Sequence, residues 1–127
     1  MKIKIYHYNV RDFVEMKKKS KNELFYEFEL DIGFVEDSEK KTDRFSMLVC
    51  NIEGLNKVYN EYINSPKVIQ FNHLMITEFY DEKKVIKLLN ERIDKIEGNT
   101  WLDIVSILSV FLNYEFSPNI PDREYIW

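Results

Sequence analysis

The chain has 127 residues and a formal net charge of −4, and its residues are 45% hydrophobic, 15% aromatic and 31% charged. This size and core content predict one ordinary domain that folds without a metal or disulfide staple, and three glycines and three prolines exclude a low-complexity or collagen-like chain. The acidic balance gives weak attraction to nucleic-acid phosphates or anionic lipid, and no segment reaches the roughly 18 apolar residues of a membrane span. We therefore expect a cytoplasmic protein that binds neither nucleic acid nor membrane.

The first predicted strand is KIKIYHYNV (2–10), in which apolar and polar residues alternate with the two-residue period of a β-strand. The alternation assigns Ile3, Ile5 and His7 to one side of the strand. The other side receives Lys2, Lys4, Tyr6 and Tyr8. Because His7 shares a side with two isoleucines, we interpret it as a structural histidine and not as a catalytic base.

The clearest strand runs from Leu24 to Phe34. Its even positions are all apolar: Leu24, Tyr26, Phe28, Leu30, Ile32 and Phe34. An all-polar segment (36–43) then leads into a second apolar run (44–52), so the two runs are predicted to pair as an antiparallel hairpin. Cys50, the chain's one cysteine, lies in the second run and is predicted to be a buried thiol in a reducing cytosol.

A short amphipathic helix is predicted after Ile52, where apolar residues step by three and four until NSP stops the pattern before Pro66. One more strand is expected over 67–80. Asp81 is then a suitable N-cap for a helix over 81–97, and Gly98 is expected to end that helix in the left-handed conformation.

The last predicted helix spans 100–113, and the spacing of Thr100 and Asp103 at its start is typical of a capping box. One stripe of apolar residues recurs at helical spacing, and we expect it to lie buried against a sheet. The stripe consists of Trp101, Ile104, Val105, Leu108, Phe111 and Leu112. The fold class is therefore predicted to be α+β. We expect an antiparallel sheet of about four strands, with the two C-terminal helices packed on one face and one short additional helix.

Residues that could carry catalysis or hold a metal are few. His7, His73 and Cys50 belong to different predicted strands, so they predict no metal site, and widely separated glycines predict no phosphate loop or nucleotide cofactor. We expect no cofactor and no catalytic residue. Glu115, between Tyr114 and Phe116, has an unusual setting and is interpreted as an anchor for the end of the last helix.

One group of residues points to binding. Glu27, Glu29 and Asp31 occupy odd positions of the clearest strand, about 6.5 to 7 Å apart, which is close to the phosphate spacing of an extended nucleic-acid strand. Such a row suits the basic groove of a partner protein, and we take these three residues as partner-binding candidates. The alternative is a solvated sheet face whose charges serve solubility alone.

Three segments of the chain resemble a known family. They are FSMLVCNIEGL (45–55), HLMITEFYDEKKVIKLL (73–89) and GNTWLDIVSILSVFLNYEF (98–116). The last is the most specific, because Gly98, Thr100, Trp101, Asp103, Leu108, Tyr114, Glu115 and Phe116 follow the pattern of the immunity protein 8 family of bacterial polymorphic toxin systems. The family's pattern has a tryptophan where this chain has Tyr114.

The resemblance implies a single immunity-protein-like domain over 1–117 with a tail at 118–127. It implies a non-catalytic protein that binds and neutralises a cognate toxin made by the same cell, and a nuclease is one candidate for that toxin. Two alternatives stay open. One is a cytosolic adaptor or regulatory module without a toxin partner, and the other is a small hydrolase built around His73 and Glu115, which requires those two side chains to meet in a cleft.

Overall fold

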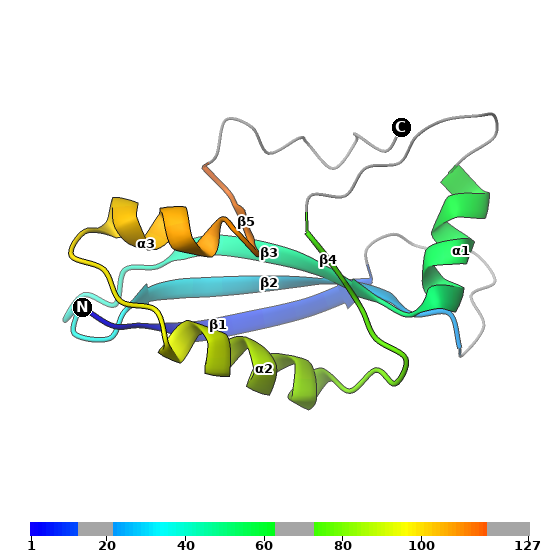
Figure 1. The fold of residues 1–127 in the computed structure, drawn as a ribbon, viewed down its shortest axis with the longest axis horizontal. Helices are drawn as coiled ribbons and strands as arrows, with labels where there is room; N and C mark the ends of the chain where they lie inside the picture. Colours follow the sequence, from blue (N-terminus) through cyan, green and yellow to red (C-terminus); the bar gives the residue numbers. More distant parts are fainter. Residues whose placement is uncertain (13–21, 63–72, 117–127) are drawn as a thin grey trace.

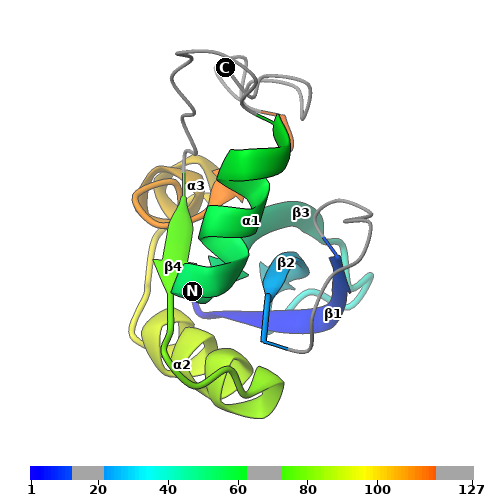
Figure 2. The same ribbon diagram turned by 90° about the vertical axis from the view of Figure 1, so that its right-hand side faces the viewer.

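The computed structural model describes residues 1–12, 22–62 and 73–116, so the predicted tail at 118–127 lies outside the described residues. The elements in chain order are β1 (Ile3–Asp12), β2 (Phe25–Phe34), β3 (Asp43–Cys50), α1 (Ile52–Tyr62), β4 (Leu74–Ile76), α2 (Glu82–Asp94), α3 (Trp101–Leu108) and β5 (Asn113–Tyr114). Helices α2 and α3 lie on the same face of the sheet, as Figures 1 and 2 show. The predicted α+β class and helix placement are therefore confirmed.

The sheet is mixed, whereas the sequence pattern predicted an antiparallel one. Strands follow the order β1-β2-β3-β4, and β5 also pairs with β3. The pairs β1–β2, β2–β3 and β3–β5 are antiparallel, but β4 runs parallel to β3. A parallel pair requires a crossover connection, and α1 lies in the crossover between these two strands. The described part of the predicted strand 67–80 is reduced to β4, and its residues 67–72 lie outside the described ones.

A β-bulge in β1 overturns the predicted side of His7. Ile5 pairs with Ile32 and His7 pairs with Asp31, so two steps along β1 correspond to one step along β2. The extra residue, Tyr6, reverses the alternation. His7 therefore shares a face with Asp31 and is exposed, instead of lying with Ile3 and Ile5.

The main core fills the space between the sheet and helices α2 and α3. The even positions of β2 that lie at its centre, Phe28, Leu30 and Ile32, are completely buried, as the alternation predicted. Leu89 and Ile93 of α2 meet Ile104 and Leu108 of α3 in the same cluster. Burial of apolar area of this kind is the main favourable contribution to folding.

A second, smaller cluster lies where α1 crosses the end of the sheet. Phe25, Leu48, Cys50 and Val58 form it, and burial raises the pKa of the Cys50 thiol to about 11. Asn51 fixes the start of α1, because its side-chain oxygen accepts hydrogen bonds from Gly54 N at 2.7 Å and Leu24 N at 3.1 Å. A Cβ at Gly54 would lie 1.9 Å from the Leu24 carbonyl oxygen, so only glycine permits this approach.

The ends of α2 and α3 correct two further predictions. Asp81 caps α2 as expected, but no glycine has a positive φ in the described part of the chain, so Gly98 is not a left-handed terminator. A Cβ there would lie 2.9 Å from Ile104 Cδ1 and 3.2 Å from Asp103 Cβ, so the Ile104 side chain would have to shift to admit it. Thr100 caps α3 by accepting from Asp103 N at 3.1 Å. The helix ends at Leu108 and not at 113, because the chain turns into β5.

Candidate functional site

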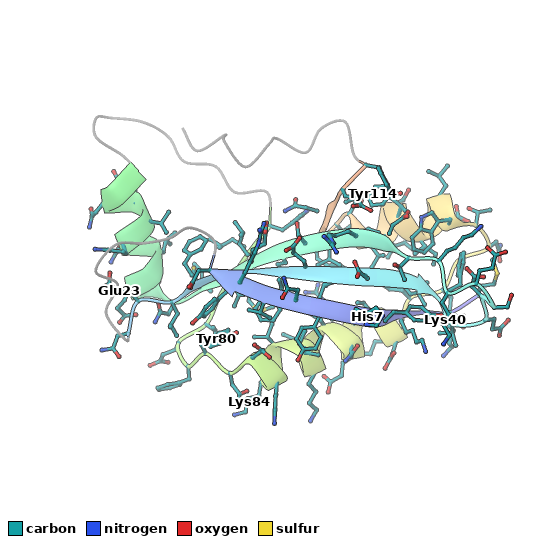
Figure 3. All side chains as sticks on the ribbon, turned by 180° about the vertical axis from the view of Figure 1, so that it is seen from behind. His7, Glu23, Lys40, Tyr80, Lys84 and Tyr114 are labelled. Atoms are coloured by element: carbon teal, nitrogen blue, oxygen red, sulfur yellow. The ribbon has the colours of Figure 1, made fainter. Side chains whose placement is uncertain are left out.

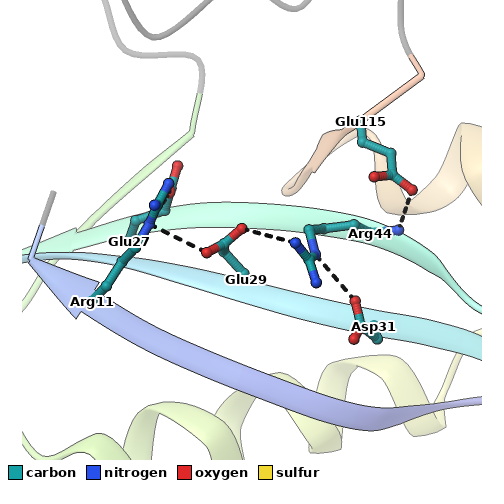
Figure 4. Close-up of polar contacts among 6 residues, drawn as sticks. All are labelled: Arg11, Glu27, Glu29, Asp31, Arg44 and Glu115. Atoms are coloured by element: carbon teal, nitrogen blue, oxygen red, sulfur yellow. Dashed lines mark hydrogen bonds and ion pairs between the residues drawn. The ribbon is translucent and has the colours of Figure 1, made fainter.

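The three acidic candidates lie on the face of the sheet that points away from α2 and α3 (Figure 4). This is the face turned toward the viewer in Figure 3, where His7, the partner of Asp31 in the register, is labelled. Glu27, Glu29 and Asp31 form the centre of this face on β2. The register places Arg11 of β1 opposite Glu27, and Arg44 of β3 opposite Asp31. We call these five residues the charge ladder.

Ion pairs run through the charge ladder without a break (Figure 4). Arg11 donates from Nε and Nη2 to Glu27 Oε1 at 2.9 and 2.5 Å, and its Nε lies 3.2 Å from Glu29 Oε1. Arg44 donates from Nη1 to Glu29 Oε2 at 3.4 Å and from Nε to Asp31 Oδ1 at 3.2 Å. Each carboxylate in the row therefore already has an arginine partner.

The carboxylates of the ladder are less accessible than the sequence suggested. The side chains of Glu27, Glu29 and Asp31 are 7%, 10% and 26% exposed, whereas both arginines are exposed. The alternative of a solvated sheet face is therefore wrong for Glu27 and Glu29, which are buried. The reason is pairing across strands, because Arg11 on β1 and Arg44 on β3 bind these carboxylates from both sides.

Burial and pairing act on the ladder in opposite directions. Burial raises the pKa of Glu27, and the hydrogen bond and charge of Arg11 oppose that rise without cancelling it. The pKa of Arg44 is raised, first by its hydrogen bond to Asp31 and then by the charges of Asp31 and Glu29. Keeping Glu27 ionised therefore costs free energy, a situation found both in structural ion pairs and in functional sites.

The two arginines and Asp43 are residues that sequence reasoning missed. A guanidinium on one strand meets a carboxylate on another only when the register brings them opposite each other, and the bulge at Tyr6 sets the register for Arg11. The signal for Arg44 was present in the predicted hairpin, which could have been aligned to place it opposite Asp31.

Asp43 joins α3 and β5 to the start of β3. Its Oδ2 atom accepts hydrogen bonds from Trp101 Nε1 and from the Tyr114 hydroxyl, each at 2.7 Å. Trp101 is half-buried and meets Phe34 and Phe45 edge-on, with ring centroids 5.2 and 6.3 Å away. Thr100, Trp101 and Tyr114, which belong to the most specific sequence segment, therefore hold α3 in place on the sheet.

Glu115 has a structural partner, as expected. Its Oε1 atom accepts from Arg44 N at 2.8 Å, and its own N–H donates to the Arg44 carbonyl at 3.1 Å. His73 lies further along the same edge of β3, where its carbonyl accepts from Leu48 N. Burial lowers the pKa of His73, against a hydrogen bond with the Ser109 backbone. Glu115 bonds to Arg44 and His73 bonds to Leu48, and these two residues of β3 are four positions, about 13 Å, apart. Glu115 and His73 therefore form no catalytic dyad.

Within residues 1–12, 22–62 and 73–116, no three His, Cys, Asp or Glu residues form a group that could hold a metal ion. In the same part of the chain, no helix is long and apolar enough to cross a membrane.

A protein-family model described as Immunity protein 8 matches residues 1–118, which covers every element described above. Comparisons with curated proteins and with solved structures find no match.

Proposed function

Because the chain belongs to the immunity protein 8 family, we propose that it binds and neutralises a cognate toxin domain made by the same bacterial cell, without catalysing a reaction. The observation that carries this proposal is the extent of the family match, from residue 1 to 118. It includes the Thr100, Trp101 and Tyr114 contacts that hold α3 on the sheet.

In this proposal the protein acts in the cytoplasm and the toxin belongs to a polymorphic toxin system. A nuclease is the toxin class that fits the charge best, because enzymes that act on nucleic acid are basic at the groove that holds the phosphates. The net charge of −4 would favour encounter with such a groove.

The charge ladder remains a proposed contact surface, but burial limits which of its residues a partner could reach. Asp31, Arg11 and Arg44 are its accessible members, and Glu27 and Glu29 hold the two guanidinium groups in position. A partner that docks here would meet charges of both signs on a rigid sheet. Such a pattern favours specificity over raw affinity.

Co-expression tests the immunity function directly. The probe is the toxin domain encoded by the gene immediately upstream, expressed in a host with this protein or with an empty vector. We expect growth arrest with the vector and full growth with the protein, together with a stable complex of the two purified chains. Growth arrest in both strains, with no complex, would refute immunity to that toxin.

A further inference from the structure

The outer surfaces of α2 and α3 differ sharply although both helices cover the same face of the sheet. The exposed residues of α2 are charged except for Leu88 and Asn90: Glu82, Lys83, Lys84, Lys87, Glu91, Arg92 and Asp94. From Leu102 to Val110, α3 and the turn after it expose Leu102, Asp103, Ser106, Ile107, Ser109 and Val110, of which Asp103 alone is charged. Leu102 and Val110 are 75% and 76% exposed.

Packing among the residues that the structure describes does not account for these aliphatic side chains. The inner face of α3 is already supplied by Ile104 and Leu108, both completely buried. Exposed apolar side chains grouped on one side of an element are typical of an interaction site. Ile107 lies at the end of α3 and Val110 in the turn that follows it, and Leu102 lies about two turns earlier on the helix. We call Leu102, Ile107 and Val110 the α3 ridge.

An open pocket of about 520 Å³ lies beside the α3 ridge, which is within the size range of ligand pockets in proteins. Ile107 and Ser106 line it from the helix, and Gly98 lines it from the loop before the helix. The carboxylates of Glu97 and Asp103 lie at the same pocket, and both residues are exposed.

These two carboxylates differ from those of the charge ladder. Among the ion pairs of the described residues, none involves Glu97 or Asp103. The N-terminal ammonium of Met1 also lines this pocket, where it donates to the Gly98 carbonyl at 3.0 Å, but it forms no ion pair with either carboxylate. A cation supplied by a partner could therefore pair with them. Such a pair at the margin of an apolar contact would be partly desolvated and worth more than one in open water.

We propose that the α3 ridge and its pocket are the principal docking surface for the toxin domain. This inference rests on the proposed immunity function. The occupant is a protein surface that presents apolar side chains to Leu102 and Val110 and directs one Lys or Arg side chain toward Glu97 and Asp103. A basic toxin groove has that chemistry. Trp101 holds α3 on the sheet through its bond to Asp43, and Thr100 caps the start of the helix.

Binding of the upstream-encoded toxin domain to two variants tests the ridge. The double substitution Leu102→Gln and Val110→Gln replaces two exposed aliphatic side chains by glutamine, which is polar and has a good helix propensity. We expect the dissociation constant to rise roughly 30-fold or more, the size of one interface hot spot. The matched control is Leu88→Gln on α2, at a leucine that is 43% exposed, which should bind as the wild type does.

A second pair of variants tests the charge. Glu97→Gln with Asp103→Asn should slow association, and it should weaken the dependence of the association rate on salt. The control is Asp94→Asn, an exposed carboxylate at the end of α2. Circular dichroism and urea denaturation of every variant establish that the fold is retained.

The outcomes separate the two proposals. A wild type that neither rescues growth nor binds the toxin domain refutes the immunity function for that toxin, and the docking surface with it. A wild type that binds while the folded Leu102→Gln/Val110→Gln variant binds equally well overturns the docking surface alone. If sedimentation finds a wild-type dimer and a monomeric ridge variant, the ridge binds a second copy of the chain and the toxin assignment is wrong.

Discussion

The charge ladder and the pocket beside α3 differ in whether their carboxylates already have a cationic partner. On the sheet, Arg11 and Arg44 pair with Glu27, Glu29 and Asp31 and connect the three antiparallel strands. Beside α3, Glu97 and Asp103 have no ion pair within the described part of the chain, and exposed aliphatic side chains lie next to them. The ladder thus connects strands within the protein, whereas the carboxylates and aliphatic side chains beside α3 are available to a partner.

This difference shows that the spacing of acidic residues on a strand does not by itself predict whether a partner can reach them. Arginines on neighbouring strands make a row of carboxylates on one strand less accessible to a partner, as Glu27 and Glu29 show. Breaking a buried pair leaves an uncompensated charge, whereas neutralising an exposed and unpaired carboxylate changes stability little.

The largest effect is expected from charge reversal in the ladder. Glu27→Lys with Glu29→Lys would bury two cations beside Arg11 and Arg44, so the free energy of unfolding should fall by more than about 3 to 5 kcal/mol. Urea denaturation measures it. Glu97→Lys beside α3 is the control and should change stability by no more than about 0.5 kcal/mol. Equal effects at the two sites would remove the distinction between them.

A smaller loss is expected on the inner side of α3. Trp101→Ala removes the edge-on contacts with Phe34 and Phe45 and the hydrogen bond to Asp43, and it should lower the free energy of unfolding by about 3 kcal/mol. That is the lower end of the range for aromatic truncation, because Trp101 is only half-buried. Leu102→Ala, one residue later on the exposed side, should cost no more than about 0.5 kcal/mol. A neutral Trp101→Ala would mean that α3 is not held through this residue.

The smallest effect concerns the pH dependence of stability. The pKa of Glu27 is raised in the folded protein, so its protonated form is favoured by folding, and the stability linked to this group is lost as the pH rises through the folded pKa. Relative to Glu27→Gln, the wild type should therefore gain stability as the pH falls from 7 to about 4. Thermal or urea unfolding across that range measures it. If the wild type instead lost stability relative to Glu27→Gln as the pH fell, the attraction of Arg11 would outweigh the effect of burial on the pKa of Glu27.

Much of the fold follows from local patterns that the sequence contains. Alternation from Leu24 to Phe34 identified the buried side of β2, and Asp81 and Thr100 marked the starts of α2 and α3. Features that depend on pairing were missed. The bulge at Tyr6 leaves no periodic signal, and the parallel pairing of β4 depends on where the chain returns after α1.

The candidate site was harder to predict because accessibility depends on cross-strand neighbours. Glu27 and Glu29 stood out by their spacing, but their burial follows from arginines on two other strands. The α3 ridge did leave a signal. Leu102, Ile107 and Val110 fall outside the helical stripe that contains Ile104 and Leu108, so this short helix is apolar on more sides than the sheet can cover.

Side-chain footprinting of the complex tests the docking surface most directly. Hydroxyl-radical labelling reports the solvent exposure of individual side chains, and Leu102, Val110 and Leu88 are all exposed in the free protein. With the upstream-encoded toxin domain bound, labelling of Leu102 and Val110 should fall severalfold while that of Leu88 on α2 stays the same, because a hot-spot residue is desolvated in a complex. Unchanged labelling of Leu102 and Val110 in a complex that has formed would contradict the assignment of α3 as the docking surface.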